Sequence, residues 1–223
     1  MSNKFIEDLS IRLAQRSKRQ LIEGMISRTP HQVATEKAVA ALQVYPLLLL
    51  LLAHDYPTKV WILDKGEKPS SAAILSPRVR RKRWHSTCIG VDDCEGLTDV
   101  VDSYVAMVVS WKTLLVMRHE FAHVVTTFFS PATRRKIERL YVDARAHATF
   151  TEPLAGESLG EYIACAMSYY FFPDLREELL AVDPALYNAV DEILGQAELV
   201  SQRIGQLDMG RVATPEPELN LAR

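Results

Sequence analysis

The sequence has few cysteines and no strong excess of charge, and both absences narrow the class of protein. Its 223 residues contain three cysteines, Cys88, Cys94 and Cys165, which are too few and too unevenly spaced for a disulfide framework. So few cysteines without a disulfide framework favour a protein of a reducing compartment. The formal net charge of -2 lacks the basic excess of a typical nucleic-acid-binding protein, so no nucleic acid is expected as a partner.

Long apolar segments are absent as well. The most apolar run, 45–53, has about half the length of a bilayer-spanning helix, so no membrane segment is expected. The N-terminus shows no apolar segment followed by a small-residue cleavage site, so no signal peptide is expected either. We therefore expect a cytoplasmic protein. The alternative is a translocated effector or toxin, which also lacks a standard signal peptide.

What is present is a globular composition, with 48% hydrophobic and 24% charged residues. Apolar periodicity predicts helices at 4–25, 30–55, 132–147, 157–172, 175–182 and 185–204, and short strands at 59–63, 72–75 and 86–91. Between 98 and 129 the pattern favours two helices, the second of which carries two histidines. The tail 211–223 is expected to be disordered.

A basic run, Arg78-Val79-Arg80-Arg81-Lys82-Arg83, lies between the second and third expected strands. Such a run is typical of a solvated loop or hairpin edge. The alternative is an edge that attracts an acidic substrate or a nucleic-acid backbone. Trp84 and His85, beside this run, are candidates for lining a substrate cleft, although Trp84 could equally cover an apolar edge.

The motif that carries chemistry is His119-Glu120-Phe121-Ala122-His123, in an apolar and helical context. Histidines four residues apart project from one helix face, so both imidazoles can reach a single zinc ion at about 2.0 Å. A Glu directly after the first His is placed to take a proton from a zinc-bound water, whose pKa the metal lowers. The motif predicts a zinc-dependent hydrolase, and the alternative is an unremarkable polar helix face.

A catalytic zinc site usually has three protein ligands and one open position. Glu157 and Glu161 stand one turn apart in an otherwise apolar segment, where buried carboxylates are costly without a cationic partner. We predict that Glu157 binds the metal and that Glu161 accepts the N–H of a ligating histidine. Alternatively, Glu157 is a first-turn residue that the helix dipole favours.

Over residues 85–195 the chain resembles the gluzincin metallopeptidases, and within them the group of the anthrax lethal factor catalytic domain and the Pro-Pro endopeptidases. That group carries HExxH and, some thirty to forty residues later, a helix of the form E-x-F-A-E-x-F; Glu157-Ser158-Leu159-Gly160-Glu161-Tyr162-Ile163-Ala164 follows this layout. The resemblance implies a zincin-like fold, a zinc ion, and a substrate peptide paired along a strand, here expected at 87–91.

One position departs from this group. A Tyr seven residues before the ligand Glu stabilises the oxyanion in the group, and this sequence has Phe150 there. Phenylalanine has no hydroxyl to donate, and one lost oxyanion donor can cost about two to three orders of magnitude in rate. His147 and Tyr141 are the nearby candidates to replace it. His147 could instead be a surface residue, and Tyr141 could be core packing.

We therefore expect a single α+β, zincin-like domain over 1–210. An N-terminal lobe of about 1–130 would contain helices, a small twisted sheet and the HExxH helix, and a helical lobe would follow at about 131–210. The expected function is zinc-dependent endopeptidase activity on a protein or peptide, with Glu120 as general base. Alternatives are a weak or inactive zinc-binding regulator that holds a partner peptide, an adaptor whose basic run contacts nucleic acid, and a regulatory peptidase that cleaves a transcription repressor.

Overall fold

The computed structural model describes residues 16–80 and 90–212, with side chains described up to residue 203. Trp84, His85 and the second half of the basic run (81–83) therefore lie outside the described residues, as does the predicted tail from residue 213 onwards. Residues 211 and 212, predicted as the start of that tail, are helical and end α10 (Pro184–Val212). At the N-terminal end of the described part, a capping box at Ser17 starts α2 (Lys18–Met25). The segment 30–55, predicted as one helix, is divided into α3 (Gln32–Leu42) and α4 (Leu47–Asp55). The break falls at Pro46, which cannot continue a helix.

The described strands form one four-stranded sheet in the order β1-β2-β4-β3. These are β1 (Ile26–Arg28), β2 (Thr58–Leu63), β3 (Gly96–Val101) and β4 (Tyr104–Ser110). β4 runs parallel to β2 and antiparallel to β3. Because β3 is last in the strand order, it forms one edge of this sheet. The strand predicted at 59–63 is confirmed as β2.

Two predictions for this region are wrong. The segment 72–75 is a turn after a short 3-10 helix, η1 (Pro69–Ser71), rather than a strand. The first helix predicted after residue 98 is instead the β3–β4 hairpin. The reason is visible in β4, where Val105 to Val109 are all buried. A strand buried on both faces has no alternation of apolar and polar residues, so its sequence resembles a buried helix.

Short elements connect the sheet to the central helix. α5 (Pro77–Arg80) contains the described part of the basic run, and η2 (Val91–Asp93) leads into β3. Within α5, Arg80 donates to the backbone oxygens of Ala73 and Leu75, whereas Arg78 is exposed. At least one arginine of the run therefore has a structural role.

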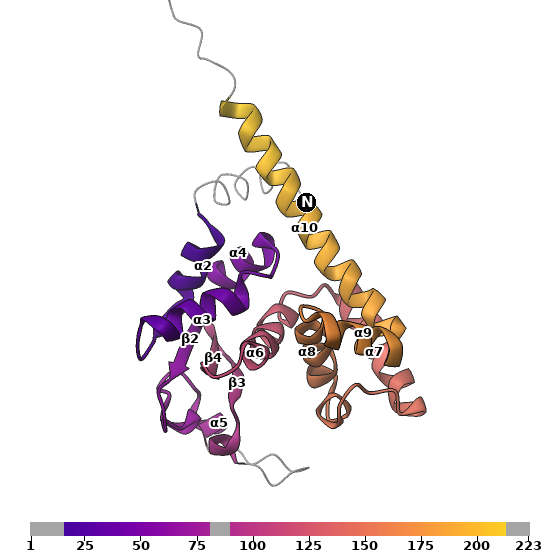
Figure 1. Ribbon diagram of the computed structural model, residues 1–223, viewed down its shortest axis with the longest axis horizontal. Coiled ribbons are helices and arrows are strands. Elements are labelled where there is room, and N and C mark those ends of the chain that lie inside the picture. Colours follow the sequence, from indigo (N-terminus) through magenta and orange to yellow (C-terminus); the bar gives the residue numbers. More distant parts are fainter. Residues whose placement is uncertain (1–15, 81–89, 213–223) are drawn as a thin grey trace, which may run out of the picture.

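The C-terminal half is helical. It contains α6 (Leu114–Thr126), α7 (Pro131–His147), α8 (Leu159–Tyr169), α9 (Pro173–Val182) and α10 (Pro184–Val212), with η3 (Pro153–Gly156) before α8. The helices predicted at 132–147, 157–172, 175–182 and 185–204 are confirmed, with shifted ends. In Figure 1, α6 lies between the N-terminal helices and sheet on one side and α7 to α10 on the other. The last part of α10 extends beyond the body of the molecule.

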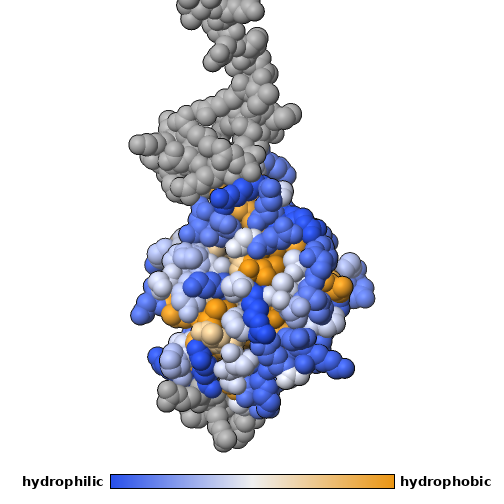
Figure 2. Space-filling view, turned by 90° about the vertical axis from the view of Figure 1, so that its left-hand side faces the viewer, coloured by the Kyte–Doolittle hydropathy of each residue, from blue (hydrophilic) through white to orange (hydrophobic). Residues whose placement is uncertain are grey.

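The core explains why α6 holds this central position. Met117, Phe121 and Val124 are fully buried and belong to one apolar cluster that joins the N-terminal helices, the sheet and α8. Phe121 packs edge-on against Tyr45, whose hydroxyl donates to the backbone oxygen of Arg118. On the face shown in Figure 2, apolar residues gather in small areas separated by hydrophilic side chains.

The predicted fold class, mainly helical α+β with a small sheet, is confirmed for the described residues. Among the described residues, no helix is both long and apolar enough to cross a membrane.

Candidate metal centre

Helix α6 presents the motif on its polar face. Thr113 caps its start by accepting from the backbone N–H of Val116. The Arg118 side chain is buried and donates to the backbone oxygens of Ala41, on α3, and Phe171, after α8. These contacts fix α6 between the two halves of the molecule, so the direction in which its histidines point is set by the packing.

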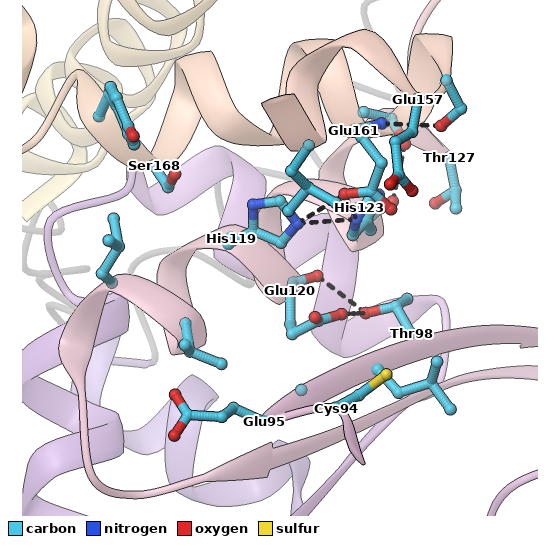
Figure 3. A pocket seen from close by; sticks show the side chains of 18 of the residues that line it. Cys94, Glu95, Thr98, His119, Glu120, His123, Thr127, Glu157, Glu161 and Ser168 are labelled. Atoms are coloured by element: carbon cyan, nitrogen blue, oxygen red, sulfur yellow. Dashed lines mark hydrogen bonds and ion pairs between the residues drawn. The ribbon is translucent and has the colours of Figure 1, made fainter. Parts of the chain in front are cut away.

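Three side chains converge on one point (Figure 3). Nε2 of His119 lies 3.2 Å from Nε2 of His123 and 2.9 Å from Oε2 of Glu161, and the last two atoms are 3.5 Å apart. Ligands at about 2.0–2.1 Å from a tetrahedral zinc ion lie about 3.3–3.4 Å from each other. The triangle therefore has the size of three zinc ligands, and imidazole nitrogens with a carboxylate oxygen are a donor set that zinc accepts.

Glu161 reaches this point because of where α8 begins. Ser158 is the N-cap and accepts from the backbone N–H of Glu161, which places Glu161 in the first helical turn facing α6. Burial alone would raise the pKa of the Glu161 carboxyl. The hydrogen bonds with His119 and His123 outweigh burial and hold this pKa at about 2. The same contact with Glu161 raises the pKa of His123, against the opposing effect of burial.

The structure does not bring Glu157 into this group. The sequence prediction made Glu157 the ligand and Glu161 its support, on the assumption that both lie one turn apart on a helix. In the structure α8 starts after Ser158, so Glu157 precedes the helix at the end of η3. Glu157 is exposed and lines the same cavity (Figure 3), and within the described residues its carboxylate forms no ion pair with either imidazole.

Glu120 points to the opposite side of the cavity, towards β3. Its carboxylate Oε2 accepts a hydrogen bond of 2.7 Å from the Thr98 hydroxyl, and its side chain is 7% exposed. Burial raises the pKa of Glu120, and the nearby histidines and the Thr98 hydroxyl act in the opposite direction. A raised pKa favours proton transfer near neutral pH, as a general base requires.

Gly96 allows β3 to approach this carboxylate. A Cβ at that position would lie 2.6 Å from Cγ of Glu120 and 2.8 Å from Cγ1 of Val116, closer than real contacts. Glycine is therefore required for the spacing of strand and helix rather than for a special backbone angle.

These groups line a cavity of about 1070 Å³ between β3, α6 and the start of α8. Its charged lining consists of Glu95, Glu120, Glu152, Glu157, Glu161 and Arg134, together with His119 and His123. Val100 on β3, 62% exposed, and Leu154, 38% exposed, are apolar side chains on its wall. The cavity can accommodate a peptide segment beside the histidines.

The residues predicted to replace the missing oxyanion donor are not in this cavity. The Tyr141 hydroxyl donates to the backbone oxygen of Gly156 at 3.0 Å. His147 lies at the end of α7, with Nδ1 2.9 Å from the backbone oxygen of Asp143. Phe150, predicted in the substrate cleft, packs instead against Tyr141, Tyr162 and Gly156 and is not among the cavity-lining residues. All three therefore contribute to packing or to helix ends.

Three residues near the candidate metal centre were missed by sequence reasoning: Thr98, Gly96 and Cys165, whose Sγ lies 3.9 Å from Nδ1 of His119. No sequence signal marked Thr98 and Gly96, because their strand was predicted in part as a helix. Cys165 was counted only for disulfides, although its place one helical turn after Glu161 put it on the same face of α8.

The comparisons with known proteins give a likeness in fold and none in sequence family. No family model matches the sequence, and no curated protein matches it. Among solved structures, the chain is similar to the Pro-Pro endopeptidase PPEP-2 from Paenibacillus alvei. The TM-score is 0.58 at 15% sequence identity, and the match covers 78% of this chain and 99% of that one. A likeness at this identity shows a shared zincin-like fold and leaves the activity open.

Proposed function

We propose that this chain is a zinc-dependent endopeptidase whose metal ligands are His119, His123 and Glu161. The observation that carries the proposal is the convergence of two imidazole Nε2 atoms and one carboxylate oxygen at ligand-to-ligand distances. Zinc bound there would supply a Lewis acid for a scissile carbonyl and would lower the pKa of a coordinated water.

Glu120 is the general base in this proposal. Thr98 holds Oε2, which leaves Oε1 to take a proton from the attacking water and to deliver it to the leaving amine. The low exposure of the side chain keeps this exchange away from bulk solvent.

The substrate is a peptide segment that we place along β3. Among the described strands, β3 is an edge of the sheet, and it lines the cavity from Gly96 to Val100, so its outward backbone groups can pair with an extended chain. The predicted pairing strand at 87–91 lies mostly outside the described residues. Peptides with a Pro-Pro bond are the first to test, because the similar structure is that of a Pro-Pro endopeptidase.

Metal content and cleavage test the proposal together. Wild type and Glu120→Gln should each bind one zinc ion, and only wild type should cleave peptides from a mixed library. Glu161→Ala should lose zinc, whereas Glu157→Ala should keep it. The opposite result for the two glutamates would restore the assignment made from sequence, and a wild type that binds no zinc would end the proposal.

A weak or inactive zinc-binding regulator is a second candidate, and one observation favours it. With Glu161 as the ligand, the position seven residues before it, where the group has its oxyanion tyrosine, is Leu154, which lines the cavity but has no hydroxyl. The Tyr141 hydroxyl is already bonded to the backbone oxygen of Gly156. Under this alternative, Glu120→Gln and wild type should hold a bound peptide with equal affinity, and wild type should leave every library peptide uncut.

A further inference from the structure

The second ring nitrogen of His119 has an unusual neighbour. Nε2 points towards His123 and Glu161, so Nδ1 points the other way, into the molecule. Among the described residues, the hydrogen-bonding partner of Nδ1 is Sγ of Cys165, at 3.9 Å. A zinc-binding histidine usually donates this N–H to a carboxylate, a backbone carbonyl or a water molecule. A thiol in that place is a weaker acceptor.

Cys165 is held in this position by α8. It follows Glu161 by one helical turn, so one helix face presents both the carboxylate at Nε2 and the thiol at Nδ1. Its side chain is fully buried. Helices α6 and α8 pack closely along this line, which leaves little freedom for either the thiol or the imidazole ring.

A carboxylate, that of Glu152, lies near the Cys165 thiol. Glu152, just before η3, lines the cavity. Burial raises the pKa of the Cys165 thiol and of the Tyr169 hydroxyl, and the nearby Glu152 carboxylate raises both further. A thiol has one hydrogen, so if that hydrogen is directed to Glu152, a sulfur lone pair is left for the N–H of His119. The observed contact is that of the Cys165 sulfur with Nδ1 of His119, and the Glu152 carboxylate is the charged group that could orient the thiol.

We propose that Cys165 is a positioning residue for the metal site: its thiol accepts the Nδ1–H of His119 and is oriented by Glu152. The thiol fixes the ring in the tautomer whose Nε2 is free to bind metal. The inference rests on the proposed zinc site and adds a role for residues that do not touch the metal. Glu152 contributes its charge indirectly, through the sulfur.

The zinc dissociation constant, measured by competition with a chromogenic chelator, tests this role without any substrate. Cys165→Ala and Cys165→Ser remove nearly the same volume, but only serine keeps an acceptor and a hydrogen. Cys165→Ala should weaken zinc binding by about tenfold or more, the usual cost of losing such a partner. Cys165→Ser should stay close to wild type. Equal affinities in the two variants would overturn the proposal, because the effect would then be packing or nothing.

Two further variants sharpen the result. Glu152→Gln should weaken zinc binding measurably, and an unchanged affinity would remove Glu152 from the chain and overturn that part of the proposal. Cys94→Ala is the matched control, because Cys94 also lines the cavity but lies near the Gly90 oxygen rather than His119. It should leave the zinc affinity unchanged, and a loss equal to that of Cys165→Ala would count against a specific role.

The His119 tautomer gives a second readout. Nitrogen NMR of the zinc-loaded protein should show His119 protonated at Nδ1 in wild type and in Cys165→Ser. Thermal unfolding of the metal-free variants shows which of them are folded. Only folded variants are used to compare zinc affinities. A wild type without zinc affinity defeats the proposed function itself. A wild type that binds zinc while alanine and serine behave alike defeats only the role of Cys165.

Discussion

The Thr98 hydroxyl lies 2.7 Å from Oε2 of Glu120 and 3.0 Å from the backbone oxygen of the same residue. A hydroxyl has one hydrogen, so these two oxygens compete for it. The shorter contact goes to the carboxylate. The edge strand of the sheet therefore holds the proposed general base through one hydrogen bond. Single substitutions of Thr98 that remove or keep the hydroxyl test this contact.

Thr98→Val keeps the shape of the side chain and removes its hydroxyl. The buried carboxylate of Glu120 would lose its donor, so the free energy of unfolding should fall by about 1–3 kcal/mol. Thr98→Ser should restore most of it. Chemical denaturation of the three proteins measures the effect, and equal stability of valine and wild type would show that the hydroxyl contributes nothing to holding Glu120.

Gly96→Ala places a methyl group against Glu120 and Val116. Since the new Cβ would lie 2.6 Å from Cγ of Glu120, strand and helix must separate, at a cost of about 1–3 kcal/mol. Gly195→Ala, on α10, is the control: nothing lies within 4 Å of its new Cβ, and alanine should stabilise the helix by up to about 1 kcal/mol. Thermal unfolding should move in opposite directions for the two variants, and a shift in the same direction would refute the close-approach argument.

Zinc affinity should depend on pH through His123. Its pKa is raised above the ordinary 6.5, since the contact with Glu161 outweighs burial. The protonated imidazole cannot bind metal, so affinity should be highest at alkaline pH and should fall as the pH drops through this raised pKa. In Glu161→Gln the raising contact is gone, so the fall attributable to His123 should begin at a lower pH. Chelator competition over a pH series measures both curves, and identical onsets would contradict this explanation.

Zinc should stabilise the fold because its ligands come from two helices that pack against each other, α6 and α8. At about one hundred times the dissociation constant, free zinc should add about 2.7 kcal/mol to the free energy of unfolding. Differential scanning calorimetry with and without a chelator measures this gain, and Glu161→Ala should show little of it. Magnesium is the control, since it prefers oxygen ligands and should leave the unfolding temperature unchanged.

The sequence alone predicted the histidine pair of the candidate metal centre. The spacing of His119, Glu120 and His123 is local, and a single helix is enough to place two imidazoles on one face. The helices after residue 131 were predicted for the same reason, because their apolar periodicity and their proline and serine starts are local signals.

The tertiary structure decided what depends on contacts between distant segments. The hairpin of β3 and β4 was predicted as a helix because β4 is buried on both faces and carries no alternation. Helix α8 (Leu159–Tyr169) begins two residues later than the helix predicted from residue 157. For this reason Glu161, rather than Glu157, lies in its first turn and contacts the histidines. Thr98, Gly96 and Cys165 acquire their roles only when β3 and α8 pack against α6. A sequence can specify which side chains are able to bind zinc, but only packing decides which of them meet.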